Sequence, residues 1–351
     1  MEKTSDKTKT AVQGEMLHNR VKKRYQHLKK WARRIGIDVF RLYDRDIPEI
    51  PLVLDLYGDT VSGALYKRPY EKDPAEETLW LTVMAGAVSD ALGIKRDRIF
   101  LKHRERQRGK SQYHKLGQKN VQREIHEEGL SFRVNLSDYL DTGFFPDRRR
   151  MRSRIRSEAS GKTLLNLFCY TATFSVCAAV GGAEEIDSVD LSHPYLRWAA
   201  VNFGLNHLKT LTVSPEFLTQ KPSSQGERTP YRLIQADVLP FLDAALKARL
   251  SWDIIILDPP AFSNSKKMSA TLDIKRDHKP LISRCLSLLK DGGKLWFSGN
   301  ARHFRLDPGE FPRWEVTDLT PFMEDEDFRG KKLPFCYTFT QINPLGVCST
   351  K

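Results

Sequence analysis

The fold class of this chain is decided by the stretch Trp252-Asp253-Ile254-Ile255-Ile256-Leu257-Asp258-Pro259-Pro260. Its run of aliphatic residues predicts a buried strand. The two prolines fix a rigid turn that lacks backbone N–H donors and directs carbonyl groups towards a ligand. The stretch therefore predicts a sheet with a binding site at the carboxyl ends of its strands.

Short apolar segments alternate with helical segments on both sides of this strand. Further strands are predicted at 163–168, 186–190, 231–235, 294–298, 313–318 and 335–342. Helices are predicted up to about residue 180 and then at 193–206, 238–248 and 277–290. Strands joined by helical crossovers pair in parallel with right-handed connections. The sequence therefore predicts an α/β fold with a doubly wound, seven-stranded, Rossmann-like sheet.

Positive charge is concentrated ahead of this region. The net charge is +13, and residues 1–160 carry +11 of it, mainly in clusters at 20–34, 102–110 and 148–156. A cationic half is typical of proteins with a polyanionic partner, most often nucleic acid, although each cluster could also be a solvated surface. The candidates for RNA binding in this half are Lys22, Lys23, Arg24, Lys29, Lys30, Arg104, Arg106, Arg108 and Lys110.

The first half also has its own pattern of elements. Helices are predicted at 20–34 and 75–92, and strands at 38–43, 52–57, 60–66, 99–101, 121–126 and 130–136. This mixture predicts a small α+β module. The predicted division is a flexible basic tail over 1–13, an α+β RNA-binding domain over 14–136, and the sheet domain over 137–351.

Several classes of protein are disfavoured by composition. No apolar run reaches the roughly 18–20 residues that span a bilayer. The charged N-terminus does not resemble a signal peptide. The five cysteines contain no C-x-x-C pair, so neither a zinc site nor a disulfide framework is indicated. We therefore expect a reduced, cytoplasmic protein without a membrane partner or a metal.

Acidic residues follow three neighbouring strands of the predicted sheet. Asp190 can accept both ribose hydroxyls of a nucleoside, and Asp237 can accept its adenine amino group. Either could instead only cap the following helix. The turn after residue 167 has no glycine, so the pyrophosphate of a dinucleotide is a poor fit. S-adenosyl-L-methionine contains adenosine without phosphate and fits better.

The chain resembles a known family in these and other motifs. They are Asn166-Leu167-Phe168-x-Tyr170-Thr171, Val189-Asp190-Leu191-Ser192, Leu233-Ile234-Gln235-Ala236-Asp237, Asp258-Pro259-Pro260-x-Phe262-Ser263-Asn264-Ser265-Lys266 and, upstream, Asn135-Leu136-x-Asp138-Tyr139-Leu140-Asp141-Thr142-Gly143. The family is the bacterial 23S rRNA guanine-N7 methyltransferases, which also occur as the C-terminal half of a fused two-activity enzyme. The resemblance extends from about residue 14 and implies the class I methyltransferase sheet.

The resemblance also implies a set of cofactor-binding residues. They are Thr142, Gly143, Phe145, Arg148, Asn166, Phe168, Tyr170, Thr171, Asp190, Ser192, Asp237, Asp258 and Pro259. Among them, Arg148 is suited to the cofactor's carboxylate, and Asp258 and Pro259 to its methyl end. Two departures from the family are Pro146 and Ala172, where the family has an aliphatic residue and glycine. Ala172 is tolerated without strain only if its φ is negative.

The residues also bear on which atom is methylated. Cytosine C5 needs attack by a cysteine thiolate, and neither the strand that ends at Asp258 nor the one that ends at Asn300 carries a cysteine there. Guanine N7 has a free lone pair and needs only in-line positioning. The predicted catalytic residues are Asp258, Pro259, Phe262 and Asn300, with Phe262 over a flipped guanine. Lys266, Lys267 and Arg302 would bind nearby phosphates.

The prediction is an S-adenosylmethionine-dependent RNA methyltransferase acting on guanine N7 of 23S rRNA or a large-subunit precursor. One alternative is a methyltransferase acting on cytosine C5 or guanine N2. The other is an RNA-binding protein with an inactive methyltransferase fold. The sequence leaves the oligomeric state open and is compatible with a monomer.

Overall fold

The computed structural model describes residues 2–68, 73–104, 120–139, 141–215, 230–263 and 271–342. The chain forms two compact units, the first comprising residues 1–146 and 325–331 and the second comprising 147–324 and 332–351. The boundary therefore lies ten residues after the predicted one. Segment 137–146 contacts the first unit, since Asn135 N–H donates to the carbonyl of Thr142 at 3.0 Å.

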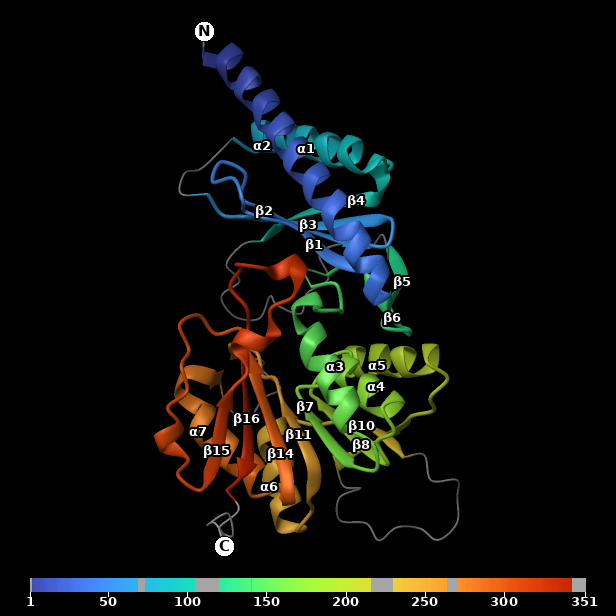
Figure 1. Cartoon of the computed structure of the whole chain (residues 1–351), viewed down its shortest axis with the longest axis vertical. Helices are drawn as coiled ribbons and strands as arrows, with labels where there is room; N and C mark the ends of the chain where they lie inside the picture. Colours follow the sequence, from blue (N-terminus) through green and yellow to red (C-terminus); the bar gives the residue numbers. More distant parts are fainter. Residues whose placement is uncertain are drawn as a thin grey trace, which may run out of the picture. The chain divides into compact units, whose positions relative to one another are not determined.

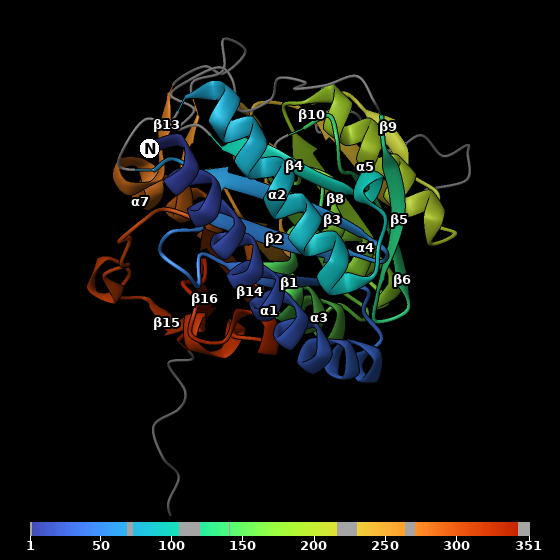
Figure 2. The same cartoon turned by 90° about the horizontal axis from the view of Figure 1, so that it is seen from above.

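The first unit is a four-stranded sheet covered by two helices. Its strands are β1 (Val39–Asp44), β2 (Leu52–Tyr57), β3 (Thr60–Tyr66) and β4 (Ile99–Arg104), in that order across the sheet. Only the β3–β4 pair is parallel. Helices α1 (Glu2–Ile35) and α2 (Pro74–Leu92) lie side by side on it (Figure 2). A separate hairpin joins β5 (Gln122–Glu127) and β6 (Leu130–Asn135).

Helix α1 is longer than the sequence predicted. The expected flexible tail over 1–13 is wrong, because α1 begins at Glu2 and its packing against α2 already involves Gln13. The buried Gln13 side chain accepts a hydrogen bond of 2.6 Å from the indole Nε1 of Trp80. The helix ends before Gly36, whose φ of 68° is the left-handed conformation that favours glycine.

The second unit contains an eight-stranded sheet. Its order is β15-β16-β14-β11-β7-β8-β10-β9. The strands are β7 (Thr163–Leu167), β8 (Glu185–Asp190), β9 (Leu211–Val213), β10 (Tyr231–Gln235), β11 (Trp252–Leu257), β14 (Leu289–Gly299), β15 (Trp314–Asp318) and β16 (Phe335–Gln341). The predicted α/β class is confirmed, with β9 as an additional edge strand. β16 pairs antiparallel with β14 and β15, and the other pairs are parallel.

Helices cover this sheet in two groups (Figure 1). Helices α3 (Arg149–Glu158), α4 (Thr173–Val180) and α5 (His193–Leu205) contact one another in sequence. Helices α6 (Val238–Lys247) and α7 (Ile274–Leu286) contact each other and, with the sheet, enclose an apolar core. Between β11 and α7 lies the short hairpin β12 (Phe262–Ser263) and β13 (Leu272–Asp273). Helix α7 begins three residues before its predicted start and ends four before its predicted end.

The third basic cluster is only partly a solvated surface. Residues 149–158 form α3, and the side chains of Arg149 and Arg152 are buried with Met151 and Ile155. Arg150 and Arg154 are exposed. The helical period places two of the arginines on the inner face of α3.

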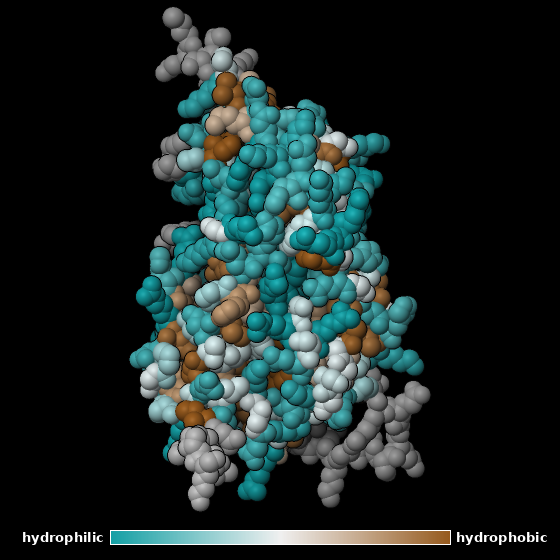
Figure 3. Space-filling model, in the orientation of Figure 1, coloured by the Kyte–Doolittle hydropathy of each residue, from teal (hydrophilic) through white to brown (hydrophobic). Residues whose placement is uncertain are grey.

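The visible surface is mainly hydrophilic, but hydrophobic groups gather over the N-terminal part of α1 (Figure 3), where Val12 and Met16 are exposed. Among the described residues, no helix combines the length and apolarity that crossing a membrane requires.

Candidate cofactor and methyl-transfer site

The central strands of the second unit end in register. Leu167 of β7 pairs with Leu257 of β11 on one side and with Val189 of β8 on the other. Asp190 in turn pairs with Gln235 of β10. The chain order reverses between β7 and β11, which is where doubly wound sheets bind their ligands. The residues that follow these strand ends therefore meet at one edge of the sheet, as predicted.

The turn after β7 has an unusual backbone. Phe168, Tyr170 and Ala172 have φ values of 56°, 54° and 58°, so three non-glycine residues are left-handed within five positions. The condition for an unstrained Ala172 is thus not met. Hydrogen bonds hold the turn: Cys169 N–H donates to the carbonyl of Val189 at 2.9 Å, and Ala172 N–H donates to that of Cys169 at 2.7 Å. Such strain is typical of functional sites.

Asp190 is the acceptor around which the turn is organised. One of its carboxylate oxygens accepts the N–H of Tyr170 at 2.9 Å, and the other accepts the N–H of Ser192 at 2.8 Å. Removal from water raises the pKa of Asp190 to about 6, against the backbone hydrogen bonds of Ser192, Tyr170 and Leu191, which lower it. Asp190 is partly exposed, and a carboxylate has about four lone-pair sites, so it can also accept a ligand hydroxyl.

Asp237 is the N-cap of α6. Its side chain accepts from the N–H of Leu239 at 3.3 Å and is partly exposed at the end of β10. The capping role is therefore real. A carboxylate has about four lone-pair sites, so capping and ligand binding are chemically compatible.

Arg148 and Asp258 face each other at this edge. Arg148 donates to the two carboxylate oxygens of Asp258 at 3.1 and 2.8 Å. Burial lowers the pKa of Arg148, but the carboxylates of Asp258 and Asp147 outweigh it, so the pKa is raised. Ser298, near the end of β14, donates its hydroxyl to Asp258 at 2.8 Å. Ser298 was not among the predicted site residues, although it is a polar residue that directly follows the apolar run Leu295–Phe297.

Three other predicted cofactor residues of this unit differ in how far they are buried and in their contacts. Tyr170 is partly exposed and packs edge-on against Tyr195, with ring centroids 4.5 Å apart. Thr171 is buried and its carbonyl accepts from Asn202 of α5. Asn166 is also buried and donates to Ser175 of α4 at 2.8 Å, which directs its amide towards that helix.

The other predicted catalytic residues follow the ends of β11 and β14 in the chain. Pro259 is buried directly after Asp258. The Phe262 side chain is 44% exposed on β12, so it is not a core anchor and can contact a ligand. Asn300 and the phosphate-binding candidate Arg302 are exposed after β14. Lys266 and Lys267 lie outside the described residues.

Three of the predicted cofactor residues belong to the first unit. Thr142 and Gly143 are buried there, and Phe145 is partly exposed. The Thr142 hydroxyl is 2.9 Å from that of Tyr57 on β2. These contacts give Thr142 a structural role within its own unit.

The predicted RNA-binding side chains divide into three groups. Lys22, Lys23, Lys29 and Lys30 are exposed on α1. Arg24 is half-buried and donates to the carbonyl of Asp327 at 3.1 Å, so its role is at least partly structural. The side chain of Arg104 and all of Arg106, Arg108 and Lys110 lie outside the described residues. Their neighbour Lys102 contacts the protein itself: it donates to the carbonyl of Tyr139 at 2.5 Å, and burial lowers its pKa to about 8.

The chemistry of this edge fits S-adenosylmethionine. Asp190 and Asp237 offer acceptors for the ribose hydroxyls and the adenine amino group. The Arg148–Asp258 pair presents one positive and one negative group, which matches the charges of a methionine carboxylate and ammonium. The bound cofactor supplies an electrophilic methyl group. Among the described residues, no cluster of histidine, cysteine and carboxylate side chains forms a metal site.

Comparisons with known proteins agree with this chemistry. Residues 50–307 match the family described as S-adenosylmethionine-dependent methyltransferase. The chain is 43% identical over 319 residues to ribosomal RNA large subunit methyltransferase K of Neisseria meningitidis, covering 91% of this chain and 85% of that protein. It is 44% identical to methyltransferase K/L of Stutzerimonas stutzeri but spans only 41% of that longer protein.

Solved structures agree as well. A structure described as the methyltransferase SMU.776 complexed with SAH, the product form of the cofactor, has a TM-score of 0.69 and 25% identity over 94% of this chain and 81% of that one. A methyltransferase from Agrobacterium tumefaciens, at 19% identity and a TM-score of 0.56, shares the fold. The chain belongs to the S-adenosylmethionine-dependent methyltransferases, within the family of ribosomal RNA large subunit methyltransferase K.

Proposed function

We propose that the protein transfers the methyl group of S-adenosylmethionine to N7 of a guanine in 23S rRNA, free or within a large-subunit precursor. The similarity to methyltransferase K over most of both chains is the observation that carries this proposal. Action on ribosomal RNA is consistent with the cytoplasmic location expected from the sequence. In this proposal Asp190 and Asp237 hold the nucleoside of the cofactor.

The cysteines favour a direct transfer over a covalent intermediate. Cys336 is influenced by the charges of Arg148 and Asp258 at the proposed transfer site. Burial raises the pKa of its thiol to about 12, and burial also raises the pKa of Cys285. Burial also raises the pKa of Cys169 on the turn after β7, so none of these three described thiols is a ready nucleophile for cytosine C5 at neutral pH.

Guanine N7 needs no base to remove a proton, so the proposed task of the protein is positioning. Phe262 would stack on the flipped guanine, and Asn300 would bind its polar edge. Asp258 and Pro259 would fix the position of the methyl group. Orientation of this kind can supply effective molarities of about 10⁵–10⁸ M.

The test is methylation of unmodified 23S rRNA by the purified protein, followed by mass spectrometry of the nucleosides. The proposal expects 7-methylguanosine, and it expects Asp190→Ala to reduce its formation together with cofactor affinity in isothermal titration. Formation of 2-methylguanosine or 5-methylcytidine would assign one of the alternative targets. RNA binding without methylation or cofactor binding would indicate an inactive fold.

A further inference from the structure

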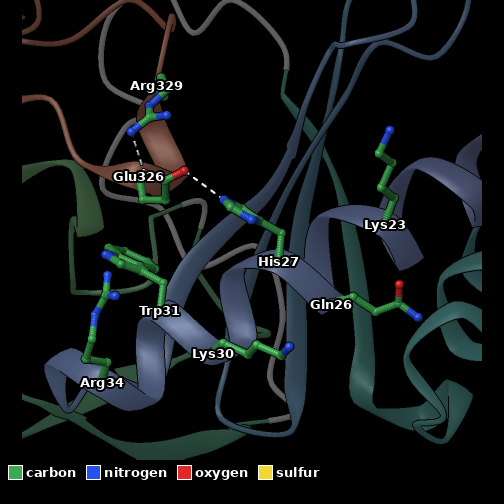
Figure 4. A pocket seen from close by; sticks show the side chains of 8 residues that line it. All are labelled: Lys23, Gln26, His27, Lys30, Trp31, Arg34, Glu326 and Arg329. Atoms are coloured by element: carbon green, nitrogen blue, oxygen red, sulfur yellow. Dashed lines mark hydrogen bonds and ion pairs between the residues drawn. The ribbon is translucent and has the colours of Figure 1, made fainter.

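The first unit contains an open pocket of about 640 Å³ that the transfer reaction does not use. We call it the α1 pocket. One wall is the C-terminal half of α1, and the other is the segment 325–331, which includes the short helix η7 (Glu326–Phe328). Charged and ionisable residues dominate its lining: Lys23, His27, Lys30, Arg34, Glu326 and Arg329 (Figure 4).

The α1 wall is a stripe of basic side chains. Spacings of four, three and four residues place them on one face of the helix, in the order Lys23, His27, Lys30 and Arg34. All four are exposed. The stripe is about 16 Å long at about 1.5 Å per residue, which is enough to follow several consecutive phosphates of a nucleic acid strand.

The opposite wall is fixed in place by hydrogen bonds. Asp327 is fully buried, and its carboxylate accepts the N–H of Arg41 at 3.0 Å. Its carbonyl accepts from Arg24 at 3.1 Å. The pocket therefore has two anchored walls and does not depend on a ligand for its shape.

One carboxylate in the lining, that of Glu326 on the 325–331 wall, reaches His27 on the α1 wall. Glu326 accepts a hydrogen bond from His27 at 2.7 Å and another from Arg329 at 2.7 Å, as the dashed lines in Figure 4 show. The hydrogen bond from His27 contributes most to lowering the pKa of Glu326. Glu326 is thus an internal anion that offsets part of the basic stripe and opposes an incoming phosphate.

We propose that the α1 pocket binds the sugar–phosphate backbone of single-stranded or looped RNA, with Glu326 limiting its affinity. Two further lining residues favour RNA over another polyanion. Gln26 carries both a donor and an acceptor for a base edge, and Trp31 adds an aromatic edge to a lining that is otherwise polar. The inference rests on the proposed function only in that the RNA belongs to the substrate.

The experiment measures binding of the full chain to a fluorescein-labelled, single-stranded RNA of mixed sequence by anisotropy. The pocket variant carries Lys23→Gln, Lys30→Gln and Arg34→Gln. At about 0.7 per lost phosphate contact, the slope of log K against log salt should fall by about 2. Affinity at about 50 mM salt should fall at least about tenfold.

The matched control removes three exposed lysines of the same unit outside the pocket, with Lys9→Gln, Lys67→Gln and Lys95→Gln. The slope of log K against log salt for this control should stay close to the wild-type slope. The difference should be no more than about one third of the change measured for the pocket variant. Because all six side chains are exposed, unfolding is not expected, and thermal melts of both triple variants verify this.

A second comparison tests Glu326. Glu326→Gln should tighten RNA binding about two- to tenfold, because it removes a carboxylate from the phosphate path. Glu15→Gln makes the same charge change at an exposed position of α1 outside the pocket and should have a smaller effect.

Three outcomes would overturn the inference: wild-type binding by the pocket triple variant, equal losses in the two triple variants, or competition by polyglutamate as strong as by RNA. The last would indicate an acidic protein partner. Methylation by the same samples separates this inference from the proposed function. If the pocket variant binds RNA and methylates it like wild type, the inference about the pocket is wrong and the proposed function is unaffected. If the pocket variant loses RNA affinity as expected but wild type forms no 7-methylguanosine, the proposed function is wrong and the inference about the pocket is unaffected.

Discussion

Replacing Arg148 by methionine should destabilise the second unit by about 3 kcal/mol. The pair it forms with Asp258 has two hydrogen bonds, and the two side chains are only 8% and 17% exposed. Removing one partner of a buried pair costs about 3–5 kcal/mol, because the other charge is left in a poorly solvated place. The lower end applies here since Asp258 keeps some exposure and the hydroxyl of Ser298.

The assay is urea unfolding at equilibrium, with thermal melting as a second readout. A loss of about 3 kcal/mol corresponds to a fall in Tm of roughly 6–12 °C for a unit of this size. The double variant Arg148→Met with Asp258→Asn should recover about 1.5–3 kcal/mol, because no unpaired charge remains.

An exposed ion pair provides the control. Arg284 and Asp243 are also 2.8 Å apart, but their side chains are 35% and 51% exposed. Arg284→Met should therefore cost less than about 1 kcal/mol. Equal losses for Arg148→Met and Arg284→Met, or strict additivity in the Arg148–Asp258 cycle, would refute the reasoning from burial.

Three more predictions follow from individual residues. Affinity for S-adenosylmethionine should fall up to about tenfold per pH unit below about pH 6, because the bound ribose favours the ionised form of Asp190. Isothermal titration from pH 5 to 8 measures this, and an affinity that does not change with pH would contradict it. Gly181→Ala should cost about 1–3 kcal/mol because a Cβ there comes within 2.1 Å of a backbone carbonyl, whereas Gly204→Ala, with open space around it, should stabilise by about 0.5–1 kcal/mol; urea midpoints distinguish them. Gln13→Ala should leave the indole of Trp80 without its partner and cost about 1–3 kcal/mol, and unchanged hydrogen exchange in α1 would count against this contact.

The central sheet was predictable from the sequence because its strands are continuous apolar runs separated by amphipathic helices. The site followed from the same pattern. Once parallel strands are accepted, residues such as Asp190 and Asp258 must emerge at one edge, whatever the rest of the chain does. The two caps of α2, Asp73 and Gly93, depend only on residues next to the helix, so they too can be recognised from the local sequence.

The contacts that the sequence did not reveal depend on partners far away in the chain. Nothing near Arg148 indicates that its partner lies 110 residues later. The left-handed turn at 168–172 was hidden for a related reason. Its bulky residues argue against such a backbone locally, and the hydrogen bonds that hold it include partners on β8 and α5, which come later in the chain.

The membership of segment 325–331 in the first unit has a consequence during synthesis. A ribosome must add 185 residues after residue 146 before this segment has been made, which takes roughly 10–40 s at about 5–20 residues per second. Throughout that interval the nascent α1 and β1 lack the acceptors that Asp327 provides for Arg24 of α1 and for Arg41 of β1. The first unit is therefore translated first but is completed only when nearly the whole chain has been made. A fragment that ends at residue 146 would lack segment 325–331 and could not complete this unit.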